Sequence, residues 1–165
     1  MTSGAGEVAK TNAACSRTSA HWSGETHSRA AGSAAALAGD PKNTWFFITA
    51  DYTFGHDLEA QVTRVVKAKG GTVLGSVKHP FPNPDFSSYL LQAQASGAKI
   101  IGMANAGADT INTIKQASEF GILQGGQRLG GLNIFLTDIY SVGLPAAQGM
   151  ILTTGFYWDM DEQTR

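Results

Sequence analysis

The chain has 165 residues, of which 42% are hydrophobic and 15% are charged, and its formal net charge at pH 7 is −1. This length suits one ordinary domain, and the apolar content is too high for a disordered chain. The Lys and Arg residues are scattered along the sequence, so no basic stripe is present that would neutralise a nucleic-acid backbone. We therefore expect a globular domain that does not bind nucleic acid.

The first quarter of the chain contains one predicted helix. Residues 1–25 mix small and polar residues without a sustained period, whereas Glu25 to Ala38 are rich in Ala and predict a helix that ends at Gly39. The polar N-terminus lacks a basic segment followed by an apolar one, so we expect no signal peptide in this chain. The apolar run Trp45 to Ile48 is far shorter than the roughly 20 residues of a membrane span. It is typical of a strand that is buried on both faces.

Strand and helix patterns then alternate along the chain. Apolar residues at spacings of three and four predict helices that end near Gly70 and Gly121, and a third helix is predicted between them. Strands separated by helices imply right-handed crossovers, so the sequence predicts an α/β fold with a doubly wound, mostly parallel sheet. The predicted helices cover residues 54–69, 86–96 and 111–120; the predicted strands cover 45–48, 72–78, 99–104, 133–137 and 150–154, with a glycine-rich loop at 125–131.

Small, polar and aromatic residues gather where the predicted strands end. Ligands of open parallel sheets bind beyond the carboxyl ends of the strands, so this edge is the expected place for a small-molecule site. Each residue also has a simpler interpretation, because Asp51 and Asp109 are suited to capping a helix and Asn105 is suited to a turn. The candidate ligand-binding residues are Asp51, Tyr52, Phe54, Asn105, Ala106 and Asp138.

Motifs for catalysis, cofactors and metals are missing from the sequence. Residues 102–107 have the glycine spacing of a phosphate loop, but Ala108 and Asp109 follow where a Lys is required. No dinucleotide-binding fingerprint follows a predicted strand, and the four His residues lack metal-binding spacing. The single cysteine, Cys15, cannot form a thiolate cage. We expect no catalytic residue, no cofactor and no metal.

Three long segments resemble one protein family. Residues 44–59 read TWFFITADYTFGHDLE, and residues 70–122 and 135–159 agree with the same family in the same order. Together they resemble the type I periplasmic solute-binding proteins of ABC transporters, in the group related to branched-chain amino-acid binders. No single motif carries this resemblance; the order of the segments does.

The resemblance implies a division of the chain and a function. Residues 1–26 would be the end of a first lobe and a hinge crossing, 27–155 the second ligand-binding lobe, and 156–165 the start of the return crossing. The protein would be periplasmic and would bind a small organic solute, such as an amino acid or an aromatic acid, between two lobes that close over it. It would then dock to the permease of an ABC-type uptake transporter.

The resemblance also assigns roles to three of the candidate residues. It implies an aromatic contact near Tyr52 and Phe54 and an acidic contact at Asp138. Where amino-acid binders of the family carry a large aromatic residue, this chain has Asn105, Ala106 and Gly107. This departure leaves more room for the solute and fits an aromatic carboxylate about as well as an aliphatic amino acid.

Two other functions stay open from the sequence. The same fold serves in the ligand-sensing domains of regulators and receptors, so a sensing role is the main alternative. A small α/β enzyme that uses Asp51, His56 or Asp138 is a further alternative, but the sequence offers no nucleophile with a placed base.

Overall fold

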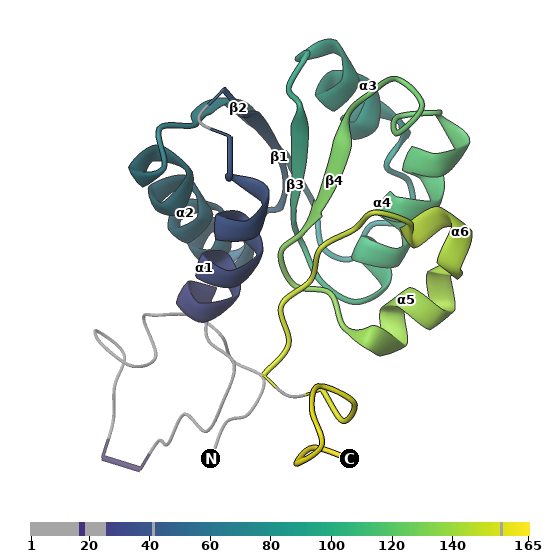
Figure 1. The fold of residues 1–165 in the computed structure, drawn as a ribbon. Coiled ribbons are helices and arrows are strands. Elements are labelled where there is room, and N and C mark those ends of the chain that lie inside the picture. Colours follow the sequence, from purple (N-terminus) through teal and green to yellow (C-terminus); the bar gives the residue numbers. More distant parts are fainter. Residues whose placement is uncertain (1–16, 19–25, 41, 156) are drawn as a thin grey trace.

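The computed structural model describes residues 17–18, 26–40, 42–155 and 157–165. Its described part contains one sheet of four strands, all parallel, in the order β2-β1-β3-β4 (Figure 1). This order places β1 and β3 in the centre and leaves β2 and β4 at the edges. The strands are β1 (Thr44–Ala50), β2 (Thr72–His79), β3 (Ile100–Ala104) and β4 (Arg128–Gly131).

Helices cover both faces of the sheet and so form three layers (Figure 1). On one face, two helices pack together and close a first hydrophobic cluster with β1; on the other face, two helices close a second cluster with β1 and β3. The doubly wound α/β prediction is therefore confirmed. The first pair is α1 (Thr26–Leu37) and α2 (Thr53–Ala68); the second pair is α3 (Ser87–Ala95) and α4 (Ala108–Glu119), with the short helices α5 (Leu136–Val142) and α6 (Leu144–Ala147) beside α4.

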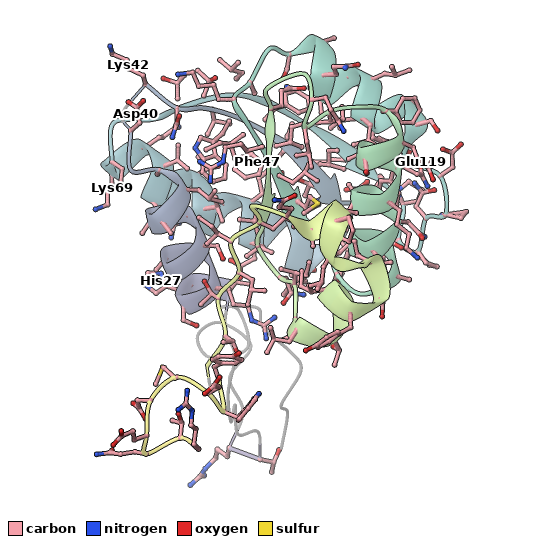
Figure 2. The ribbon with its side chains drawn as sticks, turned by 45° about the vertical axis from the view of Figure 1, so that its right-hand side comes forward. His27, Asp40, Lys42, Phe47, Lys69 and Glu119 are labelled. Atoms are coloured by element: carbon pink, nitrogen blue, oxygen red, sulfur yellow. The ribbon has the colours of Figure 1, made fainter. Side chains whose placement is uncertain are left out.

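The apolar run of β1 divides between the two faces of the sheet. Trp45 and Phe47 lie in the cluster under α1 and α2, whereas Ile48 lies in the cluster under α3 and α4 and Phe46 packs against it. Side chains of a strand alternate between faces, so a strand covered on both sides needs apolar residues at successive positions. Figure 2 shows Phe47 in the interior of the lobe.

The two ends of the sheet differ in character. Asp40 and Lys42 precede β1 and Lys69 follows α2, and Figure 2 shows all three together at the end where the strands begin. The opposite end carries the loops after the strands, and the described C-terminal residues leave the lobe on that side (Figure 1). Within the described ranges, no helix is both long and apolar enough to cross a bilayer.

The prediction for the last part of the sheet is wrong in three places. The expected loop at 125–131 contains β4, the expected strand at 133–137 is a turn followed by the start of α5, and the expected strand at 150–154 makes only one isolated bridge, between Gly130 and Ile151. Packing explains the glycines of β4. A Cβ atom would lie 3.1 Å from the Leu37 side chain at Gly130 and 2.6 Å from the Ile134 side chain at Gly131.

Smaller differences concern the ends of the helices and the first residues. Phe120, predicted to lie on a buried face, follows α4 and is 38% exposed. The start of the first helix at Glu25, Cys15 and nearly all of the predicted hinge crossing at 1–26 lie outside the described residues. The other predicted helices and strands agree with the structure to within a few residues at each end.

Candidate ligand-binding site

The carboxyl ends of β1 and β3 form the topological switch point of the sheet. These strands are neighbours, but the helix that follows β1 lies on one face and the helix that follows β3 lies on the other. The two loops therefore lead to opposite faces, and in open α/β sheets ligands bind at this point. Asp51 and Tyr52 belong to the loop after β1; Asn105, Ala106 and Gly107 belong to the loop after β3.

Gly55 allows α2 to approach this switch point closely. A Cβ atom at Gly55 would lie 2.2 Å from the carbonyl oxygen of Ala50 and 3.1 Å from that of Ala104. Only a glycine therefore lets the first turn of α2 rest on the ends of both central strands. The N-cap, Tyr52, makes no side-chain cap hydrogen bond, so the first turn of α2 is not capped by its own N-cap residue.

Aromatic rings lie along one side of the edge. Tyr52 stacks on Phe81 with ring centroids 5.0 Å apart and an interplanar angle of 26°, and its centroid is 6.0 Å from that of Phe54. Phe81 is 49% exposed, whereas Phe54 is 6% exposed and belongs to the cluster under α1 and α2. Tyr52 and Phe81 are thus the rings available to a solute, and Phe54 supports Tyr52 from the core.

Phe81 was missed by the sequence prediction. It follows β2 within the segment His79-Pro80-Phe81-Pro82, and its only local signal is an aromatic residue just beyond a strand end. The stacking on Tyr52 arises because β1 and β2 are paired in parallel, which brings their carboxyl ends together.

Asn105 is turned into the protein. It is fully buried, its Nδ2 donates to Thr113 Oγ1 at 3.1 Å, and its Oδ1 accepts from Thr110 Oγ1 at 2.8 Å. Both ends of its amide are therefore used inside the lobe to hold the loop after β3 against α4. The neighbouring Ala106 is partly buried and packs against the cluster under α1 and α2.

Asp51 forms an exposed pair with His56. The distance from His56 Nε2 to Asp51 Oδ1 is 2.8 Å, and the two side chains are 43% and 55% exposed. Solvent weakens an ion pair of this kind, so it adds little to the stability of the fold. Asp51 is the most accessible of the predicted acidic residues at this edge, and His56 is its hydrogen-bond partner.

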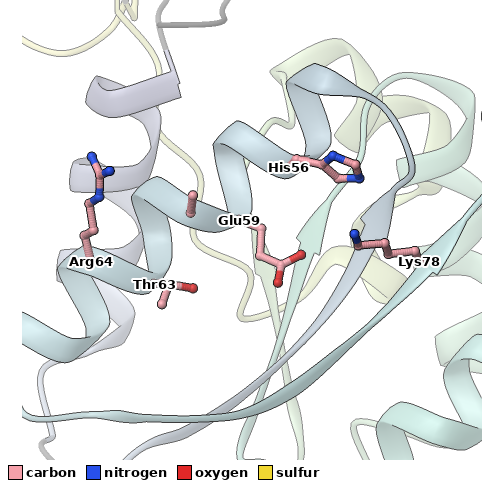
Figure 3. A pocket seen from close by; sticks show the side chains of 6 residues that line it. His56, Glu59, Thr63, Arg64 and Lys78 are labelled. Carbon is pink, nitrogen blue, oxygen red and sulfur yellow. The ribbon is translucent and has the colours of Figure 1, made fainter.

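A hollow of about 540 Å³ lies on the flank of the lobe, beside the switch point (Figure 3). Its lining comes from α2 and the edge strand β2, and Figure 3 shows Glu59 and Lys78 facing each other across it. Glu59 Oε2 also accepts a hydrogen bond from Thr49 Oγ1 at 2.5 Å. Loops after β1 and β3 do not line the hollow, so we do not assign the ligand to it.

Asp138 lies at the start of α5, after β4. Its Oδ2 accepts a hydrogen bond from the backbone N-H of Phe135 at 2.8 Å, so one carboxylate oxygen caps the first turn of the helix. The side chain is only partly buried and its other oxygen is not used by this cap. Asp138 therefore stabilises the start of α5 with one carboxylate oxygen, and this cap does not occupy the other oxygen.

Arg29 lies beside the same loop and was not predicted. It belongs to the first turn of α1; its Nη1 donates to Asn133 Oδ1, and its Cζ lies 5.3 Å from the centroid of the Phe135 ring. Burial lowers the pKa of the Arg29 guanidinium from its ordinary value. No local pattern could have found this residue, because 104 positions separate Arg29 from Asn133.

Comparison with known proteins identifies the family. A family model described as periplasmic binding protein matches residues 2–165. The chain belongs to the periplasmic binding protein family. A periplasmic binding protein of Burkholderia mallei has 46% sequence identity to it and a TM-score of 0.91, and the match covers 98% of this chain and 43% of that one. A search of curated proteins gave no match.

Two other solved binding proteins belong to ABC transporters. A branched-chain amino-acid ABC transporter periplasmic ligand-binding protein of Burkholderia xenovorans is 42% identical, with a TM-score of 0.78, and the match covers 85% of this chain and 37% of that one. An ABC transporter solute-binding protein of R. palustris in complex with benzoate is 18% identical, with a TM-score of 0.66, and the match covers 75% and 34%. The second of these similarities concerns the fold alone.

The match with the B. mallei protein shows which part of the binding-protein fold this chain contains. The chain spans about 43% of the length of its B. mallei relative, and its parallel sheet with helices on both faces is one lobe of the type I periplasmic binding protein fold. Members of this family are binding proteins, so the expectation of a binding domain rather than an enzyme is confirmed at the level of the family.

Proposed function

We propose that this chain is the second lobe of the solute-binding component of an ABC-type uptake transporter, which works in the periplasm and docks to a permease. The observation that carries the proposal is the open edge at the switch point of β1 and β3. There the rings of Tyr52 and Phe81 stack beside a small-residue loop, and Phe81 is 49% exposed. Such an edge is half of a site and needs a second lobe to enclose a solute.

The connections of the lobe support the proposed division at residues 26 and 155. Thr26, at the start of α1, donates a hydrogen bond to Asp57 near the start of α2, so α1 begins at the edge where the strands end. Thr153 lies against α1, with its Oγ1 2.9 Å from Ser33 Oγ. Both connections thus contact α1, about 10 Å apart along the helix, which is compatible with two hinge crossings to one partner lobe.

We infer that the solute is a small organic acid, either an amino acid or an aromatic acid. The B. xenovorans relative is described as a branched-chain amino-acid ABC transporter protein, and the R. palustris protein was solved with benzoate. Tyr52 and Phe81 would stack on an apolar or aromatic group, Ala106 would leave room for it, and Asp51 or Asp138 would accept hydrogen bonds from an amine or hydroxyl group. Phe54 and Asn105 would support the two loops from inside.

A thermal-shift screen of the two-lobed protein against amino acids and aromatic carboxylates tests this proposal. A ligand that binds only the folded state raises the Tm, so a true solute should give a shift that grows with its concentration. No shift with any compound of either class would contradict the proposed solute class.

The variant Phe81→Ala tests the position of the site with a solute found in this way. Loss of one stacked ring should weaken binding about fivefold, since an aromatic pair contributes on the order of 1 kcal/mol beyond its buried area. Phe120→Ala is the matched control. Phe120 is also partly exposed, but it follows the C-terminal end of α4, whereas the candidate site lies at the N-terminal end of that helix. Equal affinities of both variants and the unmodified protein, measured by calorimetry, would place the solute elsewhere.

A further inference from the structure

We infer that Asp109 is a positioning residue for the solute site: it holds the loop after β2 in the form that presents the Phe81 ring. This inference rests on the proposed function, in which Phe81 contacts the solute. It adds a buried residue that the sequence pattern indicates only as a helix cap. In this role Asp109 acts through the loop and not through a contact with the solute.

The loop between β2 and α3 has few backbone hydrogen-bond donors of its own. Residues 80–85 read Pro-Phe-Pro-Asn-Pro-Asp, so every second residue is a proline. Proline has no backbone N-H, and only three of these six residues are able to donate a main-chain hydrogen bond. A loop of this composition cannot form a ladder of backbone hydrogen bonds, and its conformation depends on side chains from other elements.

Two side chains on one face of α4 hold the loop. The Asn83 backbone N-H donates to both carboxylate oxygens of Asp109, at 3.1 Å to Oδ1 and 3.2 Å to Oδ2. Further along the chain, Gln116 Oε1 accepts from the Phe86 backbone N-H at 2.7 Å, and Gln116 Nε2 donates to the Pro84 carbonyl oxygen at 2.9 Å. Asp109 and Gln116 are about two helical turns apart, so both lie on the same face of α4.

The position of Asp109 makes it a firm anchor for the loop. Its side chain is only 1% exposed, and a buried carboxylate is costly unless it accepts hydrogen bonds. It lies in the first turn of α4, where the helix dipole favours a negative charge. A charged acceptor also binds a backbone N-H more strongly than a neutral one does. The hydrogen bond to Asn83 is therefore one of the stronger contacts available to this loop.

His79 fixes the start of the same loop. Its imidazole is fully buried, and its Nδ1 donates to the Pro80 carbonyl oxygen at 2.8 Å, whereas Asp109 Oδ2 lies 3.7 Å from this nitrogen. The His79 carbonyl oxygen accepts from the Asp51 backbone N-H at 2.8 Å, which ties the loop to the end of β1. Phe81 thus lies between a start fixed by His79 and an end fixed by Asp109.

A fixed loop matters for binding because the Phe81 ring is half exposed. The ring is 49% exposed and stacks on Tyr52, with 5.0 Å between the ring centroids. An exposed side chain on a free loop loses conformational entropy when a solute orders it, and this loss weakens binding. A loop that Asp109 already holds avoids part of the loss, so Asp109 raises the affinity for the solute.

A double-mutant cycle in the two-lobed protein tests this role, with the solute found in the thermal-shift screen and affinities measured by calorimetry. We expect Asp109→Ala to weaken binding by up to about fivefold, which is the effect of losing the ring itself. In the Phe81→Ala background the same substitution should cost no further affinity, because no ring is left to position. Asp109→Asn should restore part of the affinity, since its amide oxygen still accepts from the Asn83 N-H.

Glu119→Ala is the control, because Glu119 is an exposed carboxylate at the last residue of the same helix. It should change the affinity in neither background. An equal loss from Asp109→Ala with and without the Phe81 ring, or no loss in either background, overturns the inference while the proposed function stands. If Phe81→Ala alone has no effect, or if no compound binds, the proposed site or function fails and the inference fails with it.

Hydrogen exchange gives a second readout that needs no solute. The backbone amides of Phe81, Asn83 and Asp85 should exchange faster in Asp109→Ala than in the unmodified two-lobed protein, whereas those of β1 and β3 should not change. Unchanged exchange in the loop would overturn the inference. Should Asp109→Ala not fold, Asp109→Asn takes its place in both measurements, with a smaller loss of affinity that again requires the Phe81 ring.

Discussion

Residues that share a position at the end of a strand differ in whether a solute could reach them. Asn105 follows β3 with its side chain fully buried, whereas Phe81 follows β2 with half of its surface exposed. The sequence predicts that Asn105 lies at the carboxyl edge, because strand ends can be recognised from the apolar runs that precede them, but it does not single out Phe81. It does not predict which way a side chain points, since that depends on the partners that the fold supplies, here Thr110 and Thr113.

At the residue scale, we predict that Asn105→Ala destabilises the fold. The substitution removes the acceptor of the buried Thr110 hydroxyl group and one hydrogen bond to Thr113. A buried polar group left without a partner costs about 1–3 kcal/mol, so the free energy of unfolding in urea should fall by roughly 2 kcal/mol. Gln94→Ala is the control, because this amide is exposed on α3 and its loss should change the value little. Unchanged stability of Asn105→Ala would return Asn105 to the list of ligand contacts.

Arg29 illustrates why the surroundings of a side chain cannot be predicted from the sequence. Its neighbours on α1 are mostly small residues, and nothing in this segment points to a ligand. The side chain gains its environment only because α1 packs beside β4 and brings it to Asn133 and Phe135. The family resemblance does not supply this residue either, because none of the segments that carry it includes Arg29.

At the scale of elements, periodicity predicts the helices well and the edge of the sheet poorly. The apolar positions of α2 recur at helical spacing because one face of the helix is buried. Strand β4 is short and reads Arg-Leu-Gly-Gly, which lacks the β-branched residues that usually mark a strand. Its glycines are required by the closeness of Leu37 and Ile134, a reason that only the packed structure reveals.

The contact of α2 with the two central strands leads to a prediction for Gly55→Ala. In an exposed helix this change stabilises by up to about 1 kcal/mol, because Ala has the higher helix propensity. Here the new Cβ would lie 2.2 Å from the Ala50 carbonyl oxygen, so the first turn of α2 has to move. We expect a net loss of about 1–3 kcal/mol in the free energy of unfolding.

Gly155→Ala is the control for this measurement, since a Cβ atom there meets nothing within 4 Å. Urea unfolding of both variants gives the comparison. Equal stability of Gly55→Ala and Gly155→Ala would mean that α2 does not rest on the strand ends as closely as described.

For the whole molecule, four of the exposed large apolar residues lie close together in the sequence after β4, in and around α5 and α6. A contiguous apolar surface of this kind marks an interaction site. A partner lobe that closes over the edge where the strands end would cover such a surface. The four residues are Phe135 (47%), Leu136 (38%), Tyr140 (79%) and Leu144 (68%).

We therefore predict that the 165-residue chain alone binds the solute much more weakly than the two-lobed protein does. Half of the contacts are lost, and halving a binding free energy of roughly 8 kcal/mol turns a micromolar Kd into one near a millimolar. A solute concentration that clearly raises the Tm of the two-lobed protein should leave the Tm of the chain unchanged, measured side by side. An equal rise in both would show that one lobe holds the complete site.

The position of Thr153 against α1 has a further consequence for how such a lobe can be handled. Thr153, near the end of the described domain, contacts Ser33 in the middle of α1, so the chain leaves the domain alongside the helix by which it enters. Domains whose two ends lie on the same side tolerate insertion into a surface loop of another protein. We therefore expect this lobe to be a suitable domain for insertion experiments.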